Sequence, residues 1–266
     1  MPERAALRPV GVLGGMGPEA TLLFMQRVLA AVPAQDDADH IPLLVDQNPQ
    51  VPSRIAALIE DRGEDPSPVL AAMARRLETA GAQALVMPCN TAHAYAPAIR
   101  AAVTIPFLSM VDVTAKAIAA RYPGATVGML ASPAVKLTGV FELAFDAVDL
   151  TPLYAKDQGE LLQAIRCLKQ DGSDLGARET ALQAANALRA AGADVVLVGC
   201  SEFSLLTSAI AAHGATIDSL DALVAATISF SHSGDTAKGV SPTAVHRPGT
   251  SASKHQTGQT KREAAL

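Results

Sequence analysis

Short aliphatic runs alternate with longer amphipathic stretches along the chain, from its start to about residue 230. Aliphatic runs bounded by Gly, Pro or polar residues are typical of strands, and apolar residues spaced by three and four are typical of helices. The pattern predicts strands at residues 9–13, 43–45, 84–87, 107–110, 126–130 and 195–198. It predicts helices at residues 19–31, 68–80, 113–121, 161–169 and 176–190. This alternation indicates an α/β fold built on parallel sheet.

One segment of the sequence occurs twice in similar form. Residues 81–89 read Gly-Ala-Gln-Ala-Leu-Val-Met-Pro-Cys, and residues 192–200 read Gly-Ala-Asp-Val-Val-Leu-Val-Gly-Cys. In both, an Ala-rich helix ends at Gly-Ala, a strand follows, and a cysteine ends the strand. A weaker pair joins residues 12–15 with 129–132. The repeat predicts two similar halves that place Cys89 and Cys200 across a cleft from each other.

The repeat divides the chain into two pseudo-symmetric domains and a tail. We assign residues 1–112 together with 214–230 to the first α/β domain, and residues 113–213 to the second. Each domain is expected to be a parallel β-sheet flanked by helices, with the active site in the cleft between the two. Residues 231–266 contain no aromatic residue and few large aliphatic ones. Such a composition cannot form a core, so we predict a disordered low-complexity tail.

Composition and charge narrow the class of protein. The 266 residues are 49% hydrophobic, which is enough to bury a substantial core. Charged residues make up 18% and the net charge is -5, so no broad basic surface is expected and nucleic acid is excluded as a partner. The N-terminus does not read as a signal peptide, and no run reaches the roughly 18 apolar residues that span a bilayer. We expect a soluble, cytoplasmic protein with no membrane partner.

The three cysteines, Cys89, Cys167 and Cys200, lie far apart and lack the spacing of metal ligands. We expect free thiols in a reducing compartment. Cys89 and Cys200 stand at strand-to-helix turns, where free backbone N–H groups favour an anion. Two equivalent thiols fit the removal of a proton from one face of a carbon and its delivery to the other. The alternative is that both are buried structural residues, which is the role we expect for Cys167.

A glycine-rich turn follows the first predicted strand. Residues 15–20, Gly-Met-Gly-Pro-Glu-Ala, loosely satisfy the dinucleotide pattern Gly-x-Gly-x-x-Ala, which by itself is a weak signal. The acidic residues about 20 positions further on lie in a polar loop rather than at a strand end, which argues against a ribose contact. The glycines would instead let a small ligand approach backbone amides.

Two further side chains have open interpretations. Arg54 follows a loop stiffened by two prolines, a position suited to clamping a carboxylate, although it also fits a surface arginine. His93 follows Cys89 by four residues and would lie one helical turn along. A Cys–His hydrolase pair is therefore conceivable, with a structural histidine on the helix face as the alternative.

Three segments together resemble the signatures of the aspartate/glutamate racemase family, which belongs to a superfamily with glutamate and hydantoin racemases. They are Gly11–Pro18, Met87–His93 and Gly199–Glu202. The resemblance covers about residues 8 to 228. It implies two pseudo-symmetric α/β domains with the site between them, no pyridoxal phosphate or other cofactor, no metal, and a homodimer. It also implies that Cys89 and Cys200 are the catalytic acid/base pair.

The same resemblance implies a set of substrate-binding residues. Arg54 and Lys169 match the family's carboxylate-binding cations, and Lys169 would otherwise be interpreted as a charge at a helix C-terminus. The full implied set is Met16, Arg54, Asn90, Thr91, Ala92, Lys169 and Ser201. Two positions depart from the family pattern, since Ser53 replaces an aspartate often found before the arginine and Ser201 replaces the usual threonine.

These observations predict an enzyme, a cofactor-independent racemase of a small acidic amino acid, with aspartate as the favoured substrate. Two alternatives stay open. A maleate-isomerase or decarboxylase relative would use one cysteine in the same cleft, and a non-catalytic protein would only bind small diacids.

Overall fold

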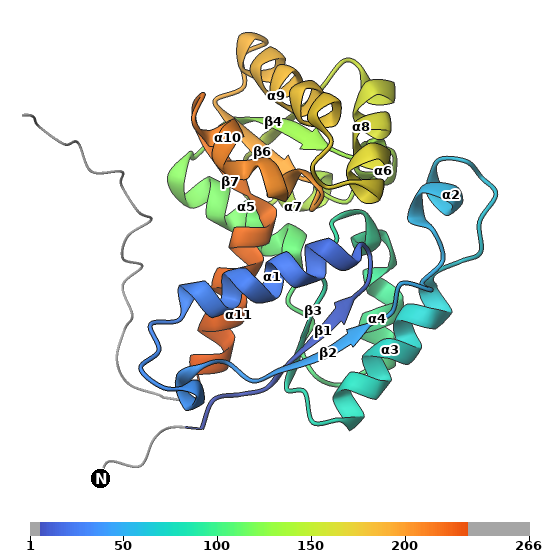
Figure 1. Ribbon diagram of the computed structural model, residues 1–266, viewed down its shortest axis with the longest axis vertical. Helices are drawn as coiled ribbons and strands as arrows, with labels where there is room; N and C mark the ends of the chain where they lie inside the picture. Colours follow the sequence, from blue (N-terminus) through green and yellow to red (C-terminus); the bar gives the residue numbers. More distant parts are fainter. Residues whose placement is uncertain (1–5, 234–266) are drawn as a thin grey trace, which may run out of the picture. The chain divides into compact units, whose positions relative to one another are not determined.

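The computed structural model describes residues 6–233, whose strands form two parallel sheets (Figure 1). The first sheet has the order β2-β1-β3, with β1 Val10–Gly14, β2 Leu43–Gln47 and β3 Ala84–Val86. The second has the order β5-β4-β6-β7, with β4 Thr126–Ala131, β5 Thr151–Tyr154, β6 Val195–Gly199 and β7 Thr216–Asp218. The predicted α/β class with two parallel sheets is confirmed.

Helices follow or connect these strands, as expected for parallel pairing. The longer helices are α1 Pro18–Ala31, α3 Ser67–Thr79, α5 Met110–Arg121, α8 Gln158–Gln170, α9 Leu175–Ala190 and α11 Ser219–His232. The shorter ones are α2 Arg54–Leu58, α4 Ala96–Ala102, α6 Pro133–Thr138, α7 Glu142–Asp146 and α10 Thr207–Ala211. Three 3-10 helices are η1 Asp37–Asp39, η2 Thr91–Tyr95 and η3 Phe203–Leu206. No helix within residues 6–233 is long and apolar enough to cross a membrane.

Both faces of each sheet are packed against helices. Along β6, Val196 and Val198 contact α8 and α9, whereas Val195 and Leu197 pack with α5 and α7. Successive strand residues point to opposite faces, so a strand buried on both faces reads as a continuous apolar run. In the first sheet, one face packs with α3 and α4 and the other with α1 and α11. The polar residues that follow the carboxyl ends of the strands form the loops of the candidate site.

The predicted strand at residues 107–110 is wrong. Only Phe107 makes an isolated parallel bridge, to Leu85 of β3. The Ser109 hydroxyl accepts a hydrogen bond from the Asp112 N–H at 3.2 Å and caps α5, so the helix begins at Met110. Serine is a favoured N-cap because its oxygen satisfies a free N–H of the first turn. The helix therefore starts three residues earlier than the pattern predicts.

The chain returns to the first half later than we assigned. Residues 216–218 form β7 and pair with β6 in the second sheet, so the segment that rejoins the first half begins with α11 rather than at residue 214. α11 packs against α1, and its Leu220 and Leu223 join the core around β1. It also packs against α5. These two helices therefore connect the cores of the two halves.

The predicted start of the tail is also too early. Ser231 lies inside α11 and is fully buried. Its hydroxyl donates to the Arg8 carbonyl oxygen at 2.9 Å, and its own carbonyl accepts from the Arg8 N–H at 3.0 Å. Residues 231–233 thus belong to the fold. The disorder predicted for residues 234–266 lies outside the described residues.

Candidate active site

A cavity of about 480 Å³ lies at the carboxyl ends of strands from both sheets. Parallel α/β sheets bind ligands at this edge because the loops that follow the strands meet there. Its lining includes residues that follow β1, β2, β3, β4 and β6, together with two residues of α8. The principal lining residues are Gly15, Met16, Gly17, Glu19, Ser53, Arg54, Ile55, Cys89, Thr91, Ser132, Ile165, Lys169, Cys200, Ser201 and Glu202.

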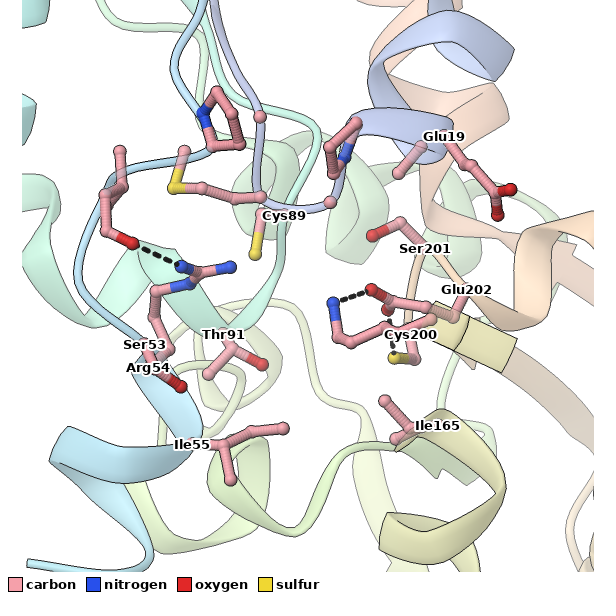
Figure 2. Close-up of a pocket in the computed structure, with 18 of the residues that line it drawn as sticks. Glu19, Ser53, Arg54, Ile55, Cys89, Thr91, Ile165, Cys200, Ser201 and Glu202 are labelled. Atoms are coloured by element: carbon pink, nitrogen blue, oxygen red, sulfur yellow. Dashed lines mark hydrogen bonds and ion pairs between the residues drawn. The ribbon is translucent and has the colours of Figure 1, made fainter. Parts of the chain in front are cut away.

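Cys89 and Cys200 occupy equivalent places on either side of this cavity. Cys89 follows β3, which pairs with β1, and Cys200 follows β6, which pairs with β4; β1 and β4 are the first strands of their sheets along the chain. Each cysteine is followed by a 3-10 helix and then a short α-helix. Both are 7% exposed, and Figure 2 shows both thiols at the same cavity. The sequence repeat is therefore a structural repeat, and it brings the two sulfur atoms to one ligand-sized space.

Cys200 is hydrogen-bonded to an acidic side chain. Its thiol donates to Oε2 of Glu202 at 2.9 Å, and the other carboxylate oxygen forms an ion pair with the Lys169 ammonium. Burial raises the pKa of Cys200 well above its usual value, and Glu202 raises it further, while Lys169 opposes both. Burial alone would raise the pKa of Glu202, but Lys169 and the Cys200 thiol outweigh burial and lower it. The three groups thus form a thiol, carboxylate and ammonium chain along one wall.

Arg54 lies on the opposite wall, at the first turn of α2. Ser53 caps this short helix by accepting from the Ala56 N–H at 3.2 Å. The Arg54 guanidinium donates to the carbonyl oxygens of Val51 and Pro52 through one nitrogen, at 3.3 and 3.1 Å. Its remaining N–H groups are on the cavity side with Cys89 in Figure 2. A guanidinium held in this way keeps donors available for a carboxylate.

The glycine-rich turn brings the N-terminus of α1 to the cavity. Gly15 has a φ of +92°, and a Cβ there would lie 2.4 Å from the Asn48 carbonyl carbon, so only glycine fits. A Cβ on Gly17 would lie 3.6 Å from both the Lys169 ammonium and the Glu202 carboxylate. Pro18 begins the helix, and the free N–H groups of its first turn favour an anion.

An ion pair outside the cavity lining joins the two walls of the cavity. Glu60, in the loop after α2, forms an ion pair with Arg166 of α8 at 2.6 Å. Arg62 also pairs with Glu60 at 2.6 Å. Ile55 of α2 and Ile165 of α8, the residue before Arg166, line the cavity (Figure 2). The segments that carry Arg54 and Lys169 are therefore connected.

His93 is a structural residue. The Met110 N–H donates to Nε2 at 2.9 Å, so Nδ1 carries the proton and donates to the Cys89 carbonyl oxygen at 2.9 Å. Burial lowers the pKa of His93 to about 4, so the ring is neutral at pH 7. Because the imidazole contacts the backbone of Cys89 rather than its thiol, the Cys–His hydrolase interpretation is wrong.

Most, but not all, of the predicted site residues meet in the cavity. Cys89, Cys200, Met16, Arg54, Thr91, Lys169 and Ser201 line it. Asn90 does not, since its side-chain N–H₂ donates to Ser219 at 2.8 Å behind the wall. Ala92 does not either, because it is fully buried in the first core. Cys167, which we expected to be buried, is only partly buried and packs at the edge of the second core.

Sequence reasoning missed Glu202 and Ser132. Glu202 stands two residues after the second cysteine of the repeat, within the strand-to-helix turn. Ser132 closes β4 at the place that Gly15 occupies after β1, and it caps α6 through the Ala134 N–H at 3.3 Å. Comparing equivalent positions of the two repeats would have indicated Ser132, which corresponds to Gly15. Within residues 6–233, no cluster of three or more His, Cys, Asp or Glu side chains is placed to hold a metal ion.

The chain belongs to the Asp/Glu/hydantoin racemase family, whose model matches residues 13–227. The broad specificity amino-acid racemase RacX of Bacillus subtilis (strain 168) is 31% identical in an alignment of 116 residues that covers 41% of this chain. The match spans 48% of that relative, about half its length. The structure of Picrophilus torridus aspartate racemase has 29% identity and a TM-score of 0.76, with 83% of this chain and 93% of that chain covered.

More distant structures share the fold alone. Glutamate racemase from Francisella tularensis subsp. tularensis SCHU S4, solved with D-glutamate, has 18% identity and a TM-score of 0.58. The alignment covers 87% of this chain and 84% of that one. The predicted family is confirmed by the family model.

Proposed function

We propose that the protein is an amino-acid racemase that moves a proton at Cα between two faces, using Cys89 and Cys200 and no cofactor. The observation that carries this proposal is the placement of two thiols at equivalent strand ends on one cavity. A single nucleophile or a binding protein would not require the second, matched thiol. The family membership of the chain supports the same reaction class.

The proposed reaction has two proton transfers. One cysteine, as a thiolate, takes the Cα proton and becomes a thiol, while the other, as a thiol, gives its proton to the opposite face and becomes a thiolate. The reverse reaction exchanges the two roles. A carbanion-like transition state carries negative charge next to the α-carboxylate, so fixed donors around that group lower the barrier.

We propose an acidic amino acid, with aspartate favoured, as the substrate. Arg54 and Lys169 supply two cations on opposite walls, and the N-terminus of α1 adds backbone N–H groups. The cavity therefore has a cation on each of two opposite walls, one for each carboxylate of an acidic amino acid. Ser53 removes a negative charge that family members often carry next to the arginine, so glutamate and neutral amino acids belong in the same assay. The chain is similar both to an aspartate racemase, that of Picrophilus torridus, and to a broad-specificity amino-acid racemase, RacX, which supports assaying a broad panel of substrates.

Incubation of each enantiomer of a panel of amino acids in heavy water tests this function. A racemase exchanges the Cα hydrogen of both enantiomers and produces the mirror image, followed by NMR and chiral chromatography. A decarboxylase or maleate-type isomerase changes the carbon skeleton or a double bond instead. A binding protein changes nothing. Protein purified with a chelator and without pyridoxal phosphate should keep full activity, which tests the absence of a cofactor.

The remaining expectations belong to the same proposal. We propose two domains that meet at the cavity, a cytoplasmic location and a homodimer. Gel filtration with light scattering measures the mass of the assembly, and a mass of one chain would contradict the homodimer.

A further inference from the structure

The two cysteines differ in the side chain that stands two residues after each of them. After Cys89 this position is Thr91, which is neutral, and after Cys200 it is Glu202. The Glu202 carboxylate accepts the Cys200 S–H hydrogen bond at 2.9 Å. Glu202 has an 11% exposed side chain, so water screens this contact little. The equivalent strand ends therefore offer their thiols different electrostatic surroundings.

The charged groups that face Cys200 come from several elements. Lys169 of α8 pairs with the same carboxylate, and Glu19 of α1 and Arg54 of α2 line the cavity further away. Cys89 lines the opposite side. Of these, Glu202 is the one for which a hydrogen bond with the Cys200 sulfur is observed within residues 6–233. A thiol can donate to a carboxylate, whereas a thiolate would face it as a like charge.

We infer that Glu202 is a positioning residue that holds Cys200 as a thiol in the free protein, so that Cys89 is the base available to the first substrate. This inference rests on the proposed racemase function. It makes the resting protein asymmetric although its two halves repeat each other. Burial of Cys200 acts in the same direction.

The proton balance of one turnover follows from this state. The Cys89 thiolate takes the Cα proton, and the Cys200 S–H bond breaks as its proton passes to the opposite face of the carbon. The new Cys200 thiolate then faces the Glu202 carboxylate, and Lys169 is the cation placed to stabilise both. The resting form returns when Cys200 regains a proton and Cys89 loses one, either through solvent or by converting a molecule of the opposite enantiomer. No other reactant is needed.

The pH dependence of alkylation tests the inference without relying on activity. In a Cys89→Ala/Cys167→Ala background, Cys200 is the remaining cysteine, and its rate of reaction with iodoacetamide follows its thiolate fraction. Adding Glu202→Gln removes the negative charge, so the midpoint should move down by about one pH unit and the rate at neutral pH should rise about tenfold. Lys169→Met should move the midpoint in the opposite direction, which provides a second test if the glutamine variant folds poorly.

The matched control uses the other thiol. In a Cys200→Ala/Cys167→Ala background, Glu202→Gln should leave the alkylation profile of Cys89 nearly unchanged. Equal shifts for both cysteines, or no shift for Cys200 in a variant with an unchanged circular dichroism spectrum, would overturn the inference.

Hydrogen exchange at Cα separates this inference from the proposed function. Exchange through Cys200 in Cys89→Ala should extend to lower pH when Glu202→Gln is added, whereas exchange through Cys89 in Cys200→Ala should not. If racemisation occurs but neither profile moves, the inference fails and the function stands. If no amino acid reacts while the alkylation shift is seen, the function fails and the thiol–carboxylate coupling stands.

Discussion

The surroundings of Cys89 and Cys200 share one backbone plan but differ in chemistry. In both halves the residue four positions after the cysteine is tied to the start of a long helix. His93 accepts from Met110 of α5, and Ser204 donates to Asp218, the N-cap of α11, at 2.8 Å. The first half uses a neutral imidazole that accepts from a backbone N–H, and the second half uses a serine hydroxyl that donates to a carboxylate. The two repeats thus share the position of the thiol but differ in the polar groups around it.

Removing either thiol should have the largest effect. Cys89→Ala and Cys200→Ala should each lower racemisation by about 10²- to 10⁴-fold, because one of the two proton transfers is lost. Each variant should keep slow Cα exchange of one enantiomer, and that enantiomer should differ between them. NMR of deuterium incorporation with each enantiomer measures this. If one variant racemised at the wild-type rate, the thiol that it lacks would not be needed for racemisation, and the two thiols would not be equivalent.

Arg54 and Lys169 should not contribute equally to kcat/KM. The Arg54 contacts are to backbone carbonyls, so its charge is available to a substrate, whereas Lys169 shares its charge with Glu202. Arg54→Ala should lower kcat/KM by about 10- to 100-fold, as expected for one or two charge-assisted hydrogen bonds. Lys169→Ala should cost less on the same substrate, and Arg54→Lys should recover part of the loss. Steady-state kinetics with a circular dichroism check decides the order, and a larger loss for Lys169→Ala would reverse our comparison.

The histidine contact should make the first half sensitive to acid. Burial lowers the pKa of His93 from 6.5 to about 4, so the unfolded chain binds a proton that the folded chain does not. Stability from this residue is present above pH 6.5 and is lost as the pH falls toward 4, by up to about 3 kcal/mol. Urea unfolding at several pH values should show a smaller acid loss for His93→Gln than for the wild type. Ser204→Ala should keep the wild-type pH dependence, and a parallel change in both variants would contradict this assignment.

The smallest effects should come from the serines that cap the short helices at the cavity. Ser53 caps α2 in the first half and Ser132 caps α6 in the second, and these two helices contact each other. Each serine-to-alanine change should lower the free energy of unfolding by about 1 kcal/mol. Thermal unfolding measures both. A much larger loss for one of them would show that it has a role beyond capping.

The strongest sequence signals predicted the central strands correctly, and they placed Cys89 and Cys200 directly after strands, as the structure does. β6 is buried on both faces, so it reads as an unbroken apolar run, and the repeat fixed the placement of Cys200 relative to Cys89. Weak or ambiguous signals failed. β7 is only three residues long, and α11 is buried on several sides, so its apolar residues show little helical periodicity. Both elements were therefore absent from the prediction.

The site was predictable where a residue type by itself limits the chemistry. A cysteine at a strand end does so, but a glutamate in a turn does not, and Glu202 becomes informative only when it is seen bonded to Cys200. Arg54 had a local argument from its stiff loop. Lys169 had none, because its position depends on how α8 packs beside the second sheet, and only the family resemblance indicated it.

In the proposed racemase, we expect the ion pair between Glu60 and Arg166 to affect the release of product. It fastens the loop after α2 to α8, close to the two isoleucines that line the cavity. Widening the cavity by moving these segments apart requires breaking this pair, so a product that leaves between them is released only when the ion pair opens. Added salt weakens partly exposed ion pairs but affects a buried proton transfer much less. Ionic strength should therefore change the residence time of the bound amino acid more than the rate of the chemical step.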